Sequence, residues 1–263
     1  MDPRAVTWMT PSEIVTQGFA TSPVVMMNEA HNGMSRCART RQVGREILPA
    51  AHAAGCRHLA MEALSNLGRG PTIGVASLRD GGYLAQPEMR EFIDAARDLG
   101  WTLIGYEIGW TVTPIERRDN PLTWAATNHR ELVQAGNLVA AWLQIDHAPM
   151  LVWCGNGHHA TIAAREWTPM GVRFRDLAGV EHFAIDQTQT VSFDGVRPPN
   201  IELTDELRAA LGMRGGTAGL IASDPPPGLE APDHFDALIL STDNEMIGDP
   251  PTGSLAGPRG LVG

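Results

Sequence analysis

Short runs of hydrophobic residues alternate with stretches of helical periodicity along residues 20–165. The hydrophobic runs each end in polar or ionisable residues, and they predict strands at 24–31, 58–64, 102–108 and 150–159. Between these runs, hydrophobic positions recur with the period of an α-helix, which predicts helices at 35–54, 87–100 and 122–143. Gly55 and Gly100 are expected to end the first two of these helices.

Strands that are hydrophobic throughout and separated by helices predict a parallel sheet covered on both faces. The expected fold class is therefore α/β, with a mostly parallel central sheet, helices on both faces and additional C-terminal strands. Further helices are expected at 11–17, 159–167 and 205–212, and the C-terminal strands at 182–193, 218–222 and 236–242. Residues 1–250 are expected to form one domain with its core at 20–170, and the Pro- and Gly-rich residues 251–263 a flexible tail. Residues 171–250 are left open as a lid, extra strands of the same sheet or a dimer contact.

The composition narrows the functional classes. With 43% hydrophobic residues the chain can build a sizeable core, and a net charge of −10 argues against non-specific binding of nucleic acid. All the basic residues are arginine, which excludes lysine Schiff-base chemistry and a P-loop lysine. The three cysteines form no CxxC pair, no hydrophobic run is long enough for a membrane span, and the N-terminal residues lack a signal core. We therefore expect a cytoplasmic protein with no membrane association.

Ionisable side chains stand at or near the carboxyl end of each early strand. They are Glu29, His31, Glu62, Glu107 and His158. Ligands of parallel α/β sheets bind at this edge, so these groups are predicted to converge in one catalytic site. Residues two apart on a strand face the same side, so Glu29 is expected to orient His31. Glu29, His31 and His158 are also candidate ligands of a divalent metal ion that acidifies water.

Other polar residues are expected to complete this site. The candidate substrate-binding residues are Arg36, Arg39, Tyr106, Arg130 and Asn156, of which the arginines would clamp an anionic group. Glu62 and Glu107 lie in otherwise hydrophobic runs, and a buried carboxylate requires a partner. The opposing interpretation is that each glutamate is a loop or cap residue. Arg41 and Arg45 are interpreted as a solvated helix face, and Cys154 as a buried thiol.

Four short motifs then suggest a family. The series NEAH (28–31), MEAL (61–64), YE (106–107) and GNGH (155–158) resembles the Tiki superfamily, which groups Tiki proteases, TraB-type, erythromycin-esterase-like and ChaN-like proteins. GNGH matches the late motif of that superfamily, whereas Asn28 stands where glycine is usual. The resemblance covers residues 20–165 and implies different activities in different branches. These are metal-dependent peptide hydrolysis, ester hydrolysis with a histidine that activates water, and haem binding.

These residues are compatible with three hypotheses. The first is a hydrolase that cleaves an ester or amide bond of a small molecule or peptide, with His31 as base, Glu29 as its orienter and His158 as metal ligand or second acid/base. The second is a ChaN-like haem or iron carrier with Tyr106 or His31 as the axial ligand. The third is a catalytically silent interaction module, in which the strand-end groups are salt-bridged and inaccessible.

Overall fold

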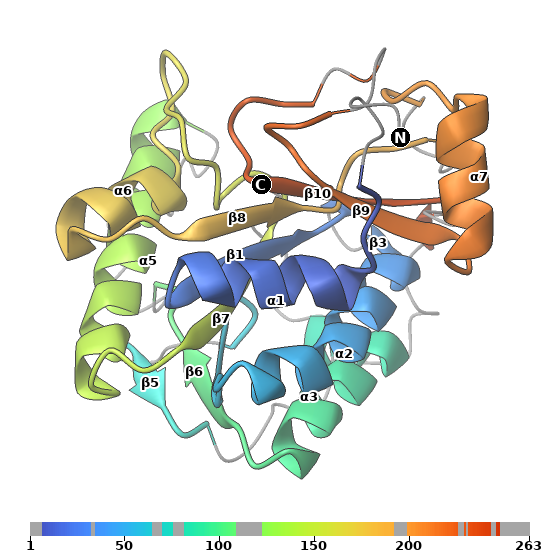
Figure 1. Ribbon diagram of the computed structural model, residues 1–263. Coiled ribbons are helices and arrows are strands. Elements are labelled where there is room, and N and C mark those ends of the chain that lie inside the picture. The colour runs from blue at the N-terminus through green and yellow to red at the C-terminus, as the bar shows by residue number, and fades with distance from the viewer. Residues whose placement is uncertain are drawn as a thin grey trace.

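The computed structural model describes residues 7–32, 35–64, 70–75, 82–108, 123–191, 199–225, 229, 231–242 and 246–247. Within these residues the chain forms an eight-stranded sheet with helices on both faces (Figure 1). In spatial order the strands are β5 (Thr72–Ile73), β6 (Thr102–Gly105), β4 (His58–Met61), β7 (Met150–Gly155), β1 (Val24–Glu29), β8 (Phe183–Asp186), β10 (Ala237–Ser241) and β9 (Thr217–Ile221). Neighbouring strands are parallel except for the edge pairs β5–β6 and β9–β10. The predicted α/β fold class is confirmed.

Helices pack on the two faces in separate sets. One face carries α1 (Pro11–Thr21), α2 (Ala38–Ala53) and α3 (Pro87–Asp98), which follows the short helix η1 (Gly82–Ala85). The other face carries α5 (Trp124–Gln144), α6 (Met170–Ala178) and α7 (Asp205–Met213). Successive residues of β1 point to opposite faces, so Val25 and Met27 join the first set while Val24 and Met26 join the second. This explains why the predicted strands are hydrophobic throughout.

The C-terminal strands extend the central sheet. β8 lies between β1 and β10, and β9 closes the edge in the antiparallel direction. β8, β9 and β10 are thus extra strands of the same sheet, which is one of the three placements left open for residues 171–250. A small second sheet follows β1 directly, and its strands are β2 (His31–Asn32), β3 (Ser35–Cys37) and β11 (Met246–Ile247). Residues 251–263, for which a flexible tail is predicted, lie outside the described residues.

Several predicted elements differ in extent, two of them for a reason that the structure shows, and one predicted helix is absent. The helix expected at 35–54 begins only at Ala38, because the preceding residues pair with β2 as β3. The strand expected at 182–193 stops at Asp186, whose Oδ1 accepts from the backbone N–H (3.0 Å) and the hydroxyl (2.7 Å) of Thr188 and so turns the chain. Residues 159–167 form no helix, and Asn128 of α5 holds the end of that loop by accepting from Thr168 N at 2.9 Å.

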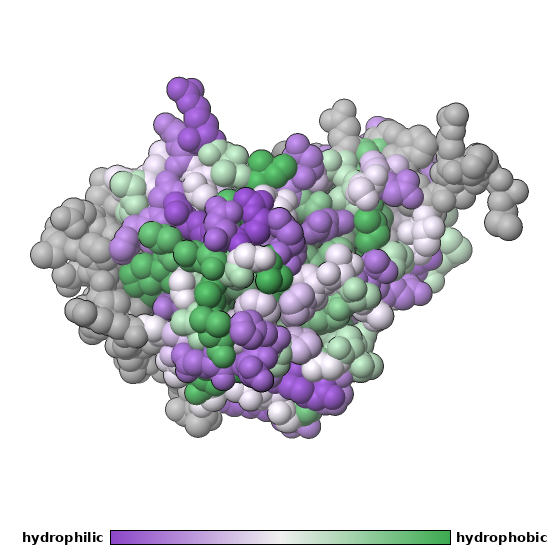
Figure 2. Space-filling view, turned by 60° about the vertical axis from the view of Figure 1, so that its left-hand side comes forward, coloured by the Kyte–Doolittle hydropathy of each residue, from purple (hydrophilic) through white to green (hydrophobic). Residues whose placement is uncertain are grey.

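The predicted helix ends at glycine are confirmed. Gly55 and Gly100 follow α2 and α3 with φ of 94° and 75°, the left-handed conformation that glycine adopts without strain. No helix of the described residues combines the length and hydrophobicity needed to cross a bilayer. Figure 2 brings the side of α5 and α6 forward and shows hydrophobic patches beside hydrophilic ones. The large exposed hydrophobic side chains of these two helices are Trp124, Leu132, Leu143 and Leu177.

Candidate functional site

The carboxyl edge of the sheet brings Glu62, Glu107 and His158 together. Glu62 follows β4, Glu107 follows β6, and His158 lies in the turn after β7. β4 pairs in parallel with both β6 and β7, so the three segments leave the sheet from adjacent strands. The structure therefore brings these three residues together as predicted, whereas their catalytic role stays a prediction.

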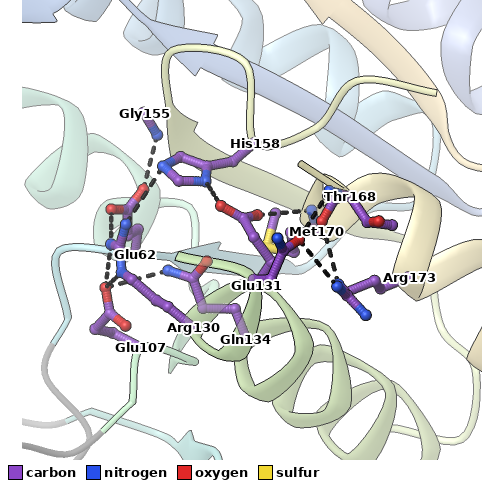
Figure 3. Close-up of polar contacts among 11 residues, drawn as sticks. Glu62, Glu107, Arg130, Glu131, Gln134, Gly155, His158, Thr168, Met170 and Arg173 are labelled. Carbon is purple, nitrogen blue, oxygen red and sulfur yellow. Dashed lines mark hydrogen bonds and ion pairs between the residues drawn. The ribbon is translucent and has the colours of Figure 1, made fainter. Parts of the chain in front are cut away.

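Arg130 of α5 joins the two carboxylates (Figure 3). Its Nη2 donates to Glu62 Oε1 and to Glu107 Oε2, and its Nε donates to Glu107 Oε2 at 2.9 Å. Gln134, one turn further along α5, donates to the same Glu107 oxygen at 3.1 Å. The second oxygen of Glu62 accepts from Gly155 N at 2.8 Å. Arg130 is thus the partner that both carboxylates require. Burial lowers the pKa of its guanidinium, but the charges of Glu107 and Glu62 and their hydrogen bonds outweigh burial, so the net pKa is raised.

His158 is paired with a carboxylate that the sequence analysis missed. Its Nδ1 lies 2.6 Å from Oε1 of Glu131, whose side chain is fully buried, and the other oxygen of Glu131 accepts from Met170 N at 2.7 Å (Figure 3). An ionised carboxylate has no hydrogen to donate, so in this pair the Nδ1 atom carries the hydrogen. The Nε2 atom is then the basic nitrogen, and it faces Nη1 of Arg130 at 3.4 Å. The imidazole has a defined tautomer and orientation.

The electrostatics of His158 favour the imidazolium. Burial lowers the pKa of this histidine, but the charges of Glu131 and Glu62 and the hydrogen bond to Glu131 outweigh burial and the charge of Arg130. The net result is a pKa above the ordinary histidine value. Protonated His158 is therefore favoured over a wider pH range than an exposed histidine, and its neutral form becomes dominant only above the raised pKa.

The cluster keeps limited contact with solvent. The side chains of Arg130, Glu62 and Glu107 are 18%, 20% and 20% exposed, and that of His158 is 15% exposed. These side chains therefore remain in contact with solvent, unlike a fully enclosed ion pair. Trp167 stands beside the histidine with its ring edge-on, 6.3 Å between centroids, and forms a hydrophobic wall there.

Glu29 lies on the opposite face of the sheet from this cluster. Its carboxylate accepts from Nε of Arg41 at 2.9 Å and from Nε1 of Trp153 at 3.3 Å, and both members of the ion pair are at most 1% exposed. The interpretation of Arg41 as a solvated residue is wrong, because it is one of the largest fully buried side chains, whereas Arg45 is half exposed. Glu29 thus forms a buried ion pair with Arg41 of α2.

Two more predicted residues use their side chains in other contacts. Tyr106 is fully buried and donates through its hydroxyl to Trp153 O at 3.1 Å, so it does not offer the exposed axial ligand that the haem hypothesis requires. Burial raises the pKa of this phenol well above its ordinary value, which disfavours a tyrosinate ligand further. Arg39 donates through Nε to Thr217 Oγ1 at 2.8 Å, at the β9 end of the sheet. Tyr106 adjoins the cluster, since the charges of Glu62, Glu107 and Arg130 act on its phenol, but its buried hydroxyl is directed at the backbone. Arg39 lies elsewhere, which does not agree with a role in binding substrate beside Glu62 and Glu107.

The remaining predicted site residues are Asn156, His31 and Arg36. The backbone of Asn156 lies in the turn after β7 with φ of 36°, and its carbonyl accepts from Asn28 Nδ2 at 2.6 Å. The side chains of His31 and Arg36 lie outside the described part of the structure. Their predicted roles stay predictions.

The predicted metal site requires Glu29 and His158 to lie close together, but the structure places them on opposite faces of the sheet. Glu29 packs against α2, whereas His158 pairs with α5 on the other face. Among the residues that the structure describes, no group of His, Cys, Asp and Glu side chains is arranged to hold a metal ion. The described ligand candidates therefore do not fit a shared metal site.

A second polar network connects the turn after β7 to β8. Asn28 is fully buried, and its Nδ2 donates to Asp186 Oδ1 at 2.6 Å while its Oδ1 accepts from Gln187 N at 2.9 Å. Asn28 thus joins β1 to the end of β8 through hydrogen bonds. Sequence periodicity gave no sign of it, because Asn28 sits in a strand end like any loop residue.

Glu131 could have been found from its helix position. Together with Gln134 it is one of the buried residues of α5, the others being Ala126, Ala135, Asn137, Leu138, Ala141 and Trp142. Polar residues on a hydrophobic stripe indicate buried partners. The adjacent Arg130 was noticed, but its neighbour on the buried side was not.

Comparison with known proteins supports the fold alone. No protein-family model and no curated protein matches the sequence. The type III effector HopBA1 has a similar structure, with a TM-score of 0.52 and 14% identity over 93% of this chain and 100% of that one. A Bacillus cereus protein gives a TM-score of 0.45 and 10% identity over 90% and 98% of the two chains. The C-terminal region of Pasteurella multocida toxin, described as having a thiol-protease-like catalytic triad, gives 0.36 and 13% over 76% and 28%.

Proposed function

We propose that the protein is a hydrolase that cleaves an ester or amide bond with water activated by His158. The observation that supports this proposal is the 2.6 Å pair between His158 Nδ1 and the buried Glu131. It makes Nε2 the basic nitrogen at a partly exposed edge, where this atom accepts from Arg130 Nη1 at 3.4 Å. A histidine oriented by a carboxylate is the arrangement that general-base catalysis uses. The base differs from His31, which the sequence favoured, because Glu29, the expected orienter of His31, is committed to Arg41.

The steps follow from these positions. Nε2 of His158 removes a proton from water as the water oxygen attacks the carbonyl carbon of the substrate. The negative charge of Glu131 stabilises the imidazolium that results. Nη1 of Arg130, which donates to Nε2 in the structure, gives up this hydrogen bond to the water and donates to the substrate oxygen, where it stabilises negative charge. The imidazolium then returns its proton to the leaving alcohol or amine, which restores the neutral base.

Glu62 and Glu107 act on Arg130 in this proposal. Their carboxylates fix the guanidinium on one side and leave Nη1 directed at the histidine. The resemblance of GNGH and MEAL to the Tiki superfamily supports the same assignment, because His158 and Glu62 fall on its late and second-strand motifs. Within that superfamily the esterase-like branch, with a histidine that activates water, agrees best with the geometry.

Hydrolysis of a panel of aryl esters and aryl amides tests the proposal. We expect the protein to hydrolyse at least one of them above the rate of a boiled sample. His158→Gln should reduce kcat/KM by about a hundredfold or more, because a positioned base contributes roughly 10²–10⁴-fold. His129→Gln, on α5, is the matched control and should retain the rate. Since His158 activates water itself, dialysis against EDTA should leave the rate unchanged.

The same panel separates the two histidines. If His31→Gln abolishes hydrolysis while His158→Gln retains it, His31 is the base and the proposal is wrong. If no member of the panel is hydrolysed, and His158→Gln binds none of the compounds differently from the unmodified protein, the site is not hydrolytic and the interaction-module hypothesis stands.

A further inference from the structure

A cavity lies at the amino edge of the sheet, opposite the edge that holds Glu62, Glu107 and His158. Its volume is about 410 Å³, which is within the range of small-molecule sites. It is formed by the start of β8, the end of β9 and the segment that leads into β10. The proposed hydrolytic site does not include this cavity, so a ligand bound here is independent of the proposed function.

The described cavity walls combine hydrophobic and polar surface, and their only charges are negative. Phe183, Ile221, Pro232 and Phe235 provide rings and aliphatic surface, and Asp233 and Asp236 provide carboxylates. No arginine or histidine is among the described residues that line it. This combination repels anions and accepts a molecule with a hydrocarbon body and a positive group.

Asp236 is a fixed carboxylate without a cation. Its Oδ2 accepts from Ala184 N at 2.8 Å, and its own backbone N donates to Ala184 O at 2.9 Å. In the described part of the chain it forms no ion pair. Burial raises the pKa of its carboxyl, and the hydrogen bond from Ala184 N lowers it by less. A partly buried charge with no counter-charge is unfavourable, and a bound cation would relieve that cost.

The aromatic walls are held in place from behind. The ring of Phe235 stacks on buried His159 with 4.8 Å between centroids, and Phe183 packs directly against Gly18 of α1, where a methyl group would lie only 2.8 Å from the ring. Walls that do not have to rearrange reduce the entropic cost of binding.

We propose that this cavity binds a small organic cation, in which a primary ammonium group that pairs with Asp236 is joined to a hydrocarbon body that contacts the Phe183 and Phe235 rings. A metal ion fits less well, because hard cations take six or more oxygen ligands and Asp233 and Asp236 supply the only carboxylates of the described lining. Asp233 lies at the rim, 89% exposed and 3.3 Å from its neighbour His234, and adds long-range attraction.

Titration with 2-phenylethylammonium, followed by NMR of backbone amides, tests this proposal. Neutral 2-phenylethanol and anionic 3-phenylpropionate serve as matched probes of the same size. We expect the cation to shift the amides of Ala184, Ala222 and Ala231, with a Kd about tenfold or more below that of the alcohol. Asp236→Asn keeps an oxygen that accepts from Ala184 N, so the variant should fold and bind the cation about tenfold more weakly.

Asp224→Asn removes an exposed carboxylate of the same loop that does not line the cavity, and it should leave the Kd unchanged. Three results would overturn the proposal. They are equal affinity for the cation and the alcohol, an unchanged Kd in Asp236→Asn, and shifts that map to Glu62 and Glu107 instead of the cavity.

Discussion

Glu131 Oε1 lies 2.6 Å from Nδ1 of His158, and its other oxygen caps the first residue of α6 through Met170 N. One buried carboxylate therefore fixes a histidine tautomer and the start of a helix at the same time. Because both oxygens act as acceptors, the pair depends on a carboxylate and not merely on a polar side chain of that size. This relationship underlies the first prediction.

Glu131→Gln should reduce hydrolysis by about a hundredfold or more. An amide replaces one acceptor by a donor, so either Met170 N faces another N–H or His158 is forced into the opposite tautomer. We also expect a loss of about 1–3 kcal/mol in the free energy of unfolding, measured with urea. Glu166→Gln, an exposed change nearby, is the control. Full activity in Glu131→Gln would show that the carboxylate does not orient the base.

Arg130→Lys should weaken the cluster although the charge is kept. A lysine cannot donate to Glu62, Glu107 and His158 from one planar group as arginine does. We expect a loss of about 1–3 kcal/mol in unfolding free energy and at least a tenfold lower kcat. Arg45→Lys, in the exposed pair with Glu91, should change stability by less than about 0.5 kcal/mol. Similar effects of both substitutions would mean that Arg130 is only a surface charge.

Glu29 is predicted to stabilise the fold without taking part in hydrolysis. Glu29→Gln leaves the guanidinium of Arg41 buried without its counter-charge, which should cost about 3 kcal/mol or more of unfolding free energy. Replacing both residues by methionine should recover part of that loss, and a double-mutant cycle measures the coupling. The kcat of folded Glu29→Gln should equal that of the unmodified protein. A selective loss of kcat would restore the catalytic role that the sequence suggested.

Stability should fall at acidic pH because two buried histidines resist protonation. Burial is the main cause that lowers the pKa of both His159 and His182. Their Nε2 atoms donate to backbone carbonyls at 2.9 and 2.7 Å, and their Nδ1 atoms have no partner among the described residues. A proton on either Nδ1 would be a buried donor without an acceptor.

The sign follows from proton binding by the unfolded chain. Below about pH 6.5 the unfolded histidines bind protons that the folded ones reject, so the free energy of unfolding decreases as pH falls, by about 1.4 kcal/mol per pH unit for each histidine. The decrease ends at the lowered pKa of the folded state. His182→Gln should reduce the slope by one proton, whereas His129→Gln should not. Equal slopes in urea titrations at pH 5 to 7 would contradict this account.

The sequence allowed the architecture and part of the site to be predicted. Hydrophobic runs that face two layers, together with helical periodicity, were enough for a covered parallel sheet, and the strand-end rule was enough to bring Glu62, Glu107 and His158 to one edge. The direction of β9 and the site of the C-terminal strands depended on long-range packing that local patterns do not encode.

The choice of partners could not be predicted in the same way. Glu29 and Glu62 look alike as strand-end glutamates, but their opposite parity along the strands sends Glu29 to α2 and Glu62 to α5. The rotation of each helix about its axis decides which arginine pairs with which glutamate. Arg41 and Arg130 lie on helices that also carry solvent-exposed charged residues, so the sequence does not distinguish them from exposed arginines. A check of polar residues on the buried stripe of α5 would have identified Glu131.

The pH–rate profile of hydrolysis, measured for the unmodified protein and for Glu131→Gln, tests the central claim most directly. We expect kcat/KM to rise with pH through a midpoint above 6.5, since His158 must lose its proton to act as base and its pKa is raised. In Glu131→Gln the midpoint should move to lower pH, because the charge that favours the imidazolium is gone. A midpoint that is the same in both proteins would contradict the assignment of His158 and Glu131 as the catalytic pair.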